Sequence, residues 1–194
     1  CSRIKLRVKA ARGGASGGTV ASMLETIRES VANPALRKLL NNPYAFCSQE
    51  RSDLPRQPNP QFASFDEDAD TWIAPFVMAV INTKVVHRSN ELSGYSYGHD
   101  FVYDEAMLTG RGLKGRATAI AIALGLAAFT GAAALKPTRA LLERFVLPKP
   151  GEGPTPAQQE AGFYDLRLIG KTATGNKLTA KVTGDRDPGY GSTC

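Results

Sequence analysis

Apolar and basic residues alternate strictly near the start of the chain. The alternating residues are Arg3, Ile4, Lys5, Leu6, Arg7, Val8, Lys9 and Ala10. This alternation predicts a β-strand with one apolar and one basic face. Near the C-terminus, alternating runs at 163–169 and 177–183 flank a Gly175–Asn176 turn and predict a hairpin whose second strand also leaves a polar face. A further strand is predicted over 101–108.

Helical periodicity follows the first strand. Apolar residues recur with one-face spacing at Val20, Met23, Leu24, Ile27 and Val31. The stretch "NPALRKLLNNPYAF" predicts a second helix. We expect a third, mostly buried helix in "TWIAPFVMAVINTKVVHRSNEL", with Thr71 as its cap and Pro75 in its first turn. Strands with helices between them predict an α+β fold, with one mainly antiparallel or mixed sheet and one helical layer.

The loop "ARGGASGGTVASMLE", residues 11–25, raises the question of phosphate binding. Its glycines and the helix behind it are features that an anion site uses. However, the strand before it is not apolar on both faces, Gly-x-Gly-x-x-Gly spacing is absent, and no ribose-binding acid follows a second strand. The pattern is not that of a Rossmann domain. The alternative is a tight turn in which Ser16 or Gly18 caps the helix.

Charge and composition narrow the function classes. The 194 residues are 42% hydrophobic and 22% charged, with 19 Gly and 12 Pro, which fits one globular domain with long loops. The 24 basic and 18 acidic side chains give a net charge of +6. The basic residues are too scattered for a nucleic-acid footprint. With three Cys and two His and no Cys-x-x-Cys pair, we predict no metal site. Residues 49–70 predict a surface loop that ends in an acidic cluster, Asp66, Glu67, Asp68 and Asp70, which we expect to solvate a helix start.

Several side chains have the chemistry of a polar site. Asn82 and Thr83 interrupt an apolar run, and Arg88, Ser89 and Asn90 gather at its far end. These polar groups either bond nearby backbone or line a polar cleft. His99 beside Asp100 suits acid–base chemistry or a simple loop contact. Phe101, Tyr103 and Glu105 share one side of the predicted strand, and Tyr97 precedes it.

The uncharged segment 117–135, "ATAIAIALGLAAFTGAAAL", is long enough to cross a membrane as a helix of about 28 Å. Nine of its 19 residues are alanine, and its small residues favour a buried or partly exposed helix over a span. The cations Lys114, Arg116, Lys136 and Arg139 flank it, which leaves peripheral contact with an anionic membrane open.

Five motifs occur in one order along the chain: "GGASGGTVASML", "PFVMAVINTKVVHRSN", "GYSYGHDFVYDE", "PKPGEGP" and "GDRDPGYGST". Together they resemble the second, substrate and dimerisation domain of the saccharopine dehydrogenase-like oxidoreductases, in the branch of the trans-acting enoyl reductases of lipid biosynthesis. The resemblance implies that 1–194 is a single-domain fragment whose N-terminal NAD(P)-binding Rossmann domain is absent. That absent domain would be a partner of this chain and would hold NAD(P)H.

The resemblance implies reduction of enoyl or lipid-linked substrates, with the cofactor doing the chemistry and this domain shaping the pocket. The expected cleft contacts are Ser16, Gly17, Gly18, Thr19, Asn82 and Arg88. By chemical type, the proton-donor candidates are Tyr97, His99 and Tyr103. We expect a cytoplasmic homodimer with possible membrane association through 117–135, and no activity or tight NAD(P)H binding from this fragment alone. The alternative is a non-catalytic lipid-binding or membrane-associated module.

Overall fold

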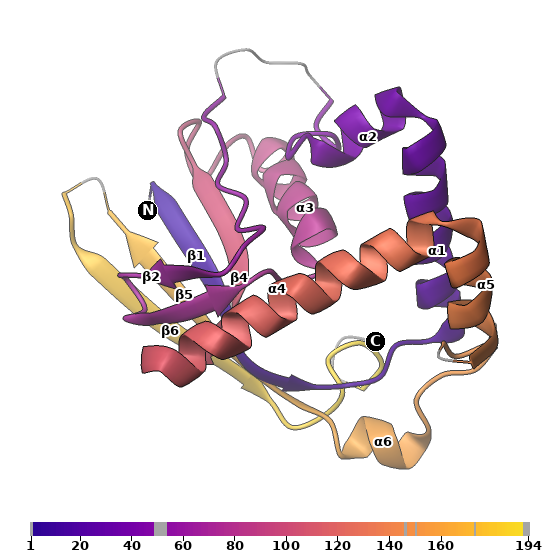
Figure 1. Ribbon diagram of the computed structural model, residues 1–194. Helices are drawn as coiled ribbons and strands as arrows, with labels where there is room; N and C mark the ends of the chain where they lie inside the picture. Colours follow the sequence, from indigo (N-terminus) through magenta and orange to yellow (C-terminus); the bar gives the residue numbers. More distant parts are fainter. Residues whose placement is uncertain (1, 49–53, 146, 150, 173, 192–194) are drawn as a thin grey trace. The chain divides into compact units, whose positions relative to one another are not determined.

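The structure is a computed structural model that describes residues 2–48, 54–145, 147–149, 151–172 and 174–191 (Figure 1). Backbone contacts divide the chain into two compact units. Unit 1 comprises Cys1–Lys9, Leu40–Ala123 and Leu166–Val182. Unit 2 comprises Ala10–Leu39, Leu124–Asp165 and Thr183–Cys194.

One six-stranded sheet organises the fold in the order β2-β3-β4-β1-β5-β6. The strands are β1 (Arg3–Arg12), β2 (Ser64–Asp66), β3 (Thr71–Ala74), β4 (Val102–Gly110), β5 (Phe163–Lys171) and β6 (Lys177–Gly184). The sheet is mixed, because β1 pairs in parallel with β4 whereas β3 is antiparallel to both β2 and β4. The α+β prediction and its mixed-sheet form are therefore confirmed, as are the four strands expected from alternation.

Six helices are found among the described residues. They are α1 (Gly17–Ala32), α2 (Pro34–Asn41), α3 (Ala79–Leu92), α4 (Gly112–Ala134), α5 (Lys136–Phe145) and α6 (Pro156–Glu160). In unit 1, α3 packs against β4 (Figure 1). In unit 2, Val20 and Leu24 of α1 form an apolar core with Ala133, and Phe129 and Leu142 pack around it.

The third helix was predicted to begin too early. Residues 71–74 form β3, with Ile73 paired to Leu108 of β4, and the helix begins only at Ala79. Thr71, Trp72 and Ile73 are β-branched or aromatic residues that suit a strand when a partner strand is available. Thr71 is therefore not a helix cap, and the residue at the N-cap of α3, Met78, makes no capping side-chain bond.

The basic face of the first strand is not an open polar face. Strand β1 is central, and Lys5 and Arg7 on that face are 9% and 2% exposed. The acidic cluster covers them: Asp66 is 4% exposed and pairs with both cations. Our prediction that this cluster solvates a helix start is therefore wrong. Asp66 instead pairs with buried cations of the sheet, and such burial is possible only where the charges pair. By contrast, β6 is an edge strand with exposed side chains.

Candidate functional site

Three backbone N–H groups of the glycine loop before α1 donate hydrogen bonds to other parts of the protein. The N–H of Gly14 donates to Asp187 Oδ2 at 2.6 Å, and that of Gly17 donates to the Glu152 carbonyl at 2.8 Å. The N–H of Ser16 donates to Tyr190 Oη at 3.3 Å. These are the donors that a phosphate-binding loop would offer to its ligand.

The same glycines are needed for close packing against the C-terminal part of unit 2. A Cβ added to Gly14 would lie 2.5 Å from Pro154 Cβ, and one added to Gly17 would lie 1.8 Å from the Lys149 carbonyl oxygen. Close packing and the helix cap therefore account for these glycines, as the turn-and-cap alternative expects.

The four residues predicted as cleft contacts lie together at the start of α1. Ser16 is the N-cap, and its Oγ accepts the N–H of Thr19 at 3.2 Å, as the capping hypothesis expected. Tyr190 Oη lies 3.3 Å from Thr19 Oγ1. Gly17 is buried and Gly18 is exposed. Their predicted role in contacting a substrate or cofactor stays a prediction.

Unit 1 holds a buried cluster that joins two other predicted residues. Glu105 of β4 is 2% exposed and receives hydrogen bonds on both carboxyl oxygens. Tyr103 Oη donates to Oε1 at 2.7 Å, and Asn82 Nδ2 of α3 donates to Oε2 at 2.9 Å. Sequence reasoning placed Tyr103 and Glu105 on one side of the strand but did not single out Glu105 as the residue that links Tyr103 to Asn82.

The register of the parallel pair explains why no cation among the described residues bonds this carboxyl group. Tyr103 and Glu105 lie beside Ile4 and Leu6 of β1, so they occupy the apolar face of the sheet. Burial there raises the pKa of Glu105, although the hydrogen bonds from Tyr103 and Asn82 oppose the rise. Burial also raises the pKa of Tyr103, and the charge of Glu105 adds to that effect.

Tyr97 and His99 lie instead on an exposed loop that α3 anchors. Asn90 at the end of α3 is 5% exposed, and its side chain bonds the loop at two points. Its Nδ2 donates to the Gly98 carbonyl at 2.9 Å, and its Oδ1 accepts the Tyr97 N–H at 2.9 Å. Tyr97 is 47% exposed, and the His99 ring stacks on Tyr95 at 4.2 Å.

Arg88, the last of the predicted cleft residues, lies in a local surface network. Its guanidinium donates to Glu91 and to Ser48 Oγ. Desolvation alone would raise the pKa of Glu91, but the hydrogen bonds from Ser48 and Arg88 together lower it. The structure therefore does not bring Arg88 into contact with Asn82, Tyr103 or the Tyr97 loop through any hydrogen bond among the described residues.

The opposite face of the sheet carries a buried charge network. Arg7 donates through Nε to Asp66 at 2.7 Å and through Nη2 to Asp104 at 2.6 Å. Lys5 bridges Asp66 and Asp68 at 2.8 and 2.6 Å. A cavity of about 460 Å³ lies against this network. The basic alternation and the downstream acidic cluster were both visible in the sequence, but nothing in the sequence showed that they face each other.

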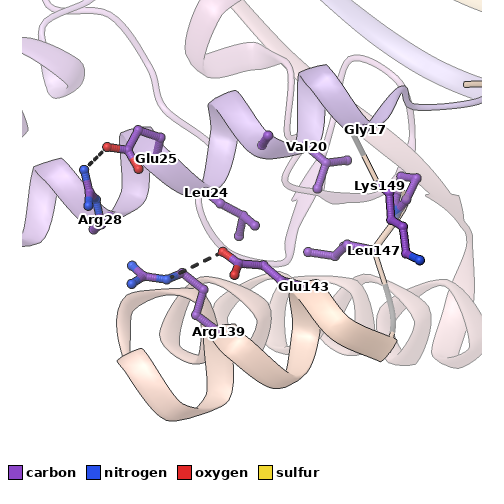
Figure 2. A pocket seen from close by; sticks show the side chains of 11 residues that line it. Gly17, Val20, Leu24, Glu25, Arg28, Arg139, Glu143, Leu147 and Lys149 are labelled. Atoms are coloured by element: carbon purple, nitrogen blue, oxygen red, sulfur yellow. Dashed lines mark hydrogen bonds and ion pairs between the residues drawn. The ribbon is translucent and has the colours of Figure 1, made fainter. Parts of the chain in front are cut away.

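A second cavity, of about 430 Å³, lies in unit 2 between α1 and α5 (Figure 2). Val20, Leu24 and Leu147 supply apolar side chains. Charged residues line the rest of it: Glu25, Arg28, Arg139, Glu143 and Lys149. Figure 2 shows that four of them are paired, Arg28 with Glu25 and Arg139 with Glu143. Among the described residues, no group of three His, Cys, Asp or Glu is arranged to hold a metal ion.

Comparisons with known proteins give one consistent group of relatives. A Mycobacterium tuberculosis protein whose name reads Putative trans-acting enoyl reductase is 37% identical over 96% of this chain, which covers 46% of the relative. Proteins named trans-acting enoyl reductase from Mycobacterium ulcerans and Mycobacterium bovis are 33% identical over 92% of the chain and 44% of their own lengths. The chain thus spans less than half the length of these relatives. No family model matches it, and neither does any solved structure.

Proposed function

We propose that this chain is the substrate-side portion of an NAD(P)H-dependent enoyl reductase of the saccharopine dehydrogenase-like type, acting on lipid-linked enoyl substrates. The observation that carries the proposal is the match along nearly the whole chain to proteins named trans-acting enoyl reductases. These relatives are more than twice as long as the matched region, which leaves room in them for a separate dinucleotide-binding domain.

The hydrogen bonds of the glycine loop support the proposal that another part of the protein binds the dinucleotide. The N–H groups of Gly14, Ser16 and Gly17 already bond Asp187, Tyr190 and Glu152, which supports a structural role for the loop. We therefore assign dinucleotide binding to a part of the protein outside this chain and derive no catalytic step through the cofactor here. The chain's own contribution is to bind and orient the enoyl substrate.

Among the three proton-donor candidates, exposure favours the anchored loop. Tyr97 is exposed on backbone that Asn90 holds in place, so it can meet a substrate without rearrangement of the sheet. Tyr103 is 5% exposed and its hydroxyl donates to Glu105, so its role is to hold the carboxyl group that Asn82 of α3 also bonds. We propose Tyr97 as the group to test first and His99, next to it, as the second.

The decisive experiment follows NADPH oxidation by the full-length protein with an enoyl thioester, beside the saturated thioester as control. We expect oxidation with the enoyl substrate alone, and no dinucleotide binding by residues 1–194 in a calorimetric titration. Tyr97→Phe should reduce turnover at least tenfold without a change in unfolding, since losing a general acid costs about two orders of magnitude or more. Lack of oxidation by a folded full-length protein that binds NADPH would refute the proposed activity.

A further inference from the structure

Helix α4 is apolar along most of its length, yet protein covers little of it. It runs from Gly112 to Ala134 and is long and apolar enough to cross a membrane, yet only 11% of its most apolar stretch is buried. Leu113, Leu124 and the following Leu135 are 83%, 65% and 61% exposed. A helix that is apolar on all sides is stable in water only when something apolar covers it.

The charge distribution indicates what covers it. Residues 106–142 contain none of the 18 acidic residues and five of the 24 basic ones: Arg111, Lys114, Arg116, Lys136 and Arg139. The remaining 157 residues carry 19 basic and 18 acidic side chains, so almost all of the net charge of +6 belongs to this one segment. Cations stand at both ends of the helix, which disfavours pairing with a second copy of itself in either direction.

From these observations we infer that α4 docks the protein on an anionic lipid surface, with the helix lying along the interface and the flanking lysines among the headgroups. A helix of 23 residues is about 34 Å long and can bury its exposed leucines at the headgroup and acyl boundary. Each lysine or arginine near such a surface contributes about 1 kcal/mol of attraction.

Protein contacts along α4 argue against a span. Ala119 and Ala133 are 0% exposed, and Ala133 belongs to the apolar core that α1 forms in unit 2. One side of the helix is therefore already covered by protein, whereas lipid would surround a lone spanning helix on all sides. The start of α4 is also fixed to the sheet, because Thr109 Oγ1 lies 2.9 and 3.0 Å from the Gly115 and Trp72 carbonyls and can donate to either.

Flotation of the full-length protein tests the inference. Vesicles of phosphatidylcholine alone are compared with vesicles of phosphatidylcholine and phosphatidylglycerol in equal parts, at low and high salt. We expect flotation on the anionic vesicles, reversed by salt. Lys114→Gln with Lys136→Gln should weaken binding roughly 25-fold, about fivefold for each charge removed. Leu124→Gln should weaken it about tenfold, because the apolar contact is lost.

The matched control is Leu178→Gln on edge strand β6, where the leucine is 60% exposed. This variant should float like the wild type, and thermal unfolding should show that all variants remain folded. Three results would overturn the inference: no flotation on anionic vesicles, equal loss in the Leu178→Gln control, or a change of oligomeric state on Leu124→Gln without any lipid binding. The last would mean that protein covers α4. None of these variants should change NADPH oxidation with a water-soluble thioester. The lipid-binding test is therefore separate from the test of the proposed enzyme activity.

Discussion

Strand β4 buries one carboxyl group on each face, and the two faces neutralise them in different ways. Asp104 and Glu105 are neighbours in sequence and are 1% and 2% exposed. Asp104 faces the guanidinium of Arg7, which it shares with Asp66. In the part of the chain that the structure describes, Glu105 is bonded by the neutral donors of Tyr103 and Asn82. Ion pairing fixes the charge on one face, whereas the other face holds a carboxyl group whose charge is costly.

The pKa directions follow this difference. Burial alone would raise the pKa of Asp66, but its bonds to Lys5 and Arg7 lower the pKa overall. For Glu105 burial dominates over the two neutral donors, and the pKa is raised. A buried carboxylate therefore keeps its charge where cations share its face of the sheet, and tends to lose it where the face is apolar. The comparison can be tested by removing each kind of partner.

Removing Arg7 should have the largest effect. Arg7→Leu would leave Asp66 and Asp104 buried without their shared cation, and we expect a loss of about 3–5 kcal/mol in the free energy of unfolding. Arg3→Leu is the control, because Arg3 also contacts Asp104 but its side chain is 39% exposed, so the loss should stay below about 1 kcal/mol. Urea denaturation at neutral pH measures both. Equal losses would show that the network is not the buried support described here.

The face of the sheet that holds Glu105 and is covered by α3 also holds His87. This residue gives a second prediction. His87 is 3% exposed between the rings of Tyr44 and Phe101, and burial lowers its pKa to about 4. A depressed pKa means that stability is full above the unfolded value of about 6.5 and is lost as pH falls toward 4. Thermal unfolding between pH 7 and pH 4.5 should show a decline of about 2 kcal/mol that His87→Phe abolishes. An unchanged decline in the variant would exclude His87 as its source.

Acid should weaken the ion-paired face in a lower pH window. Bonds from Lys171 and Lys5 outweigh desolvation and bring the pKa of Asp68 to about 2. Stability from this pairing is present above the unfolded value of about 4 and is lost as pH falls from 4 toward 2. We expect about 1 kcal/mol, because solvent screens this partly exposed pair. Asp68→Asn should remove that part of the acid decline and leave the His87 window unchanged, as followed by circular dichroism.

Sequence patterns predicted four of the six strands, because those four keep their alternation whatever lies against them. They missed β2, which lies inside the predicted surface loop 49–70, and β3. Ser16 as a cap and the helix behind it also follow from local chemistry. The errors arose where a distant partner decided the outcome. Residues 71–74 became a strand because β4 was available to pair with them, and Lys5 and Arg7 became buried because Asp66 lies across from them. Local propensity does not contain these partners.

The lack of information about distant partners also explains why the buried cluster around Glu105 was not predicted. The sequence singled out Tyr103 and Asn82 separately, on a strand and on a helix, and the side chain that joins them is Glu105. Its signal was a carboxylate on the apolar side of an alternating strand, since Glu105 is in register with Leu6. A charged residue out of phase with the pattern is the feature that would have identified the cluster.

Replacing Glu105 should have the smallest effect and the opposite pH dependence. A raised folded pKa means that the contribution of Glu105 to stability is present below its unfolded pKa, about 4.3, and is lost as pH rises through the folded value. Glu105→Gln keeps the shape and resembles the protonated acid, with one acceptor oxygen and one donor group, so we expect a cost of at most about 1 kcal/mol at pH 4. Because glutamine does not ionise, the variant should lose this deficit toward pH 8, where the wild type bears the cost of a buried charge. Urea denaturation of the two proteins at both pH values measures the difference. A deficit that stays constant or grows with pH would show that Glu105 is ionised in the folded state at no cost, and the two faces of β4 would then not differ in the way argued here.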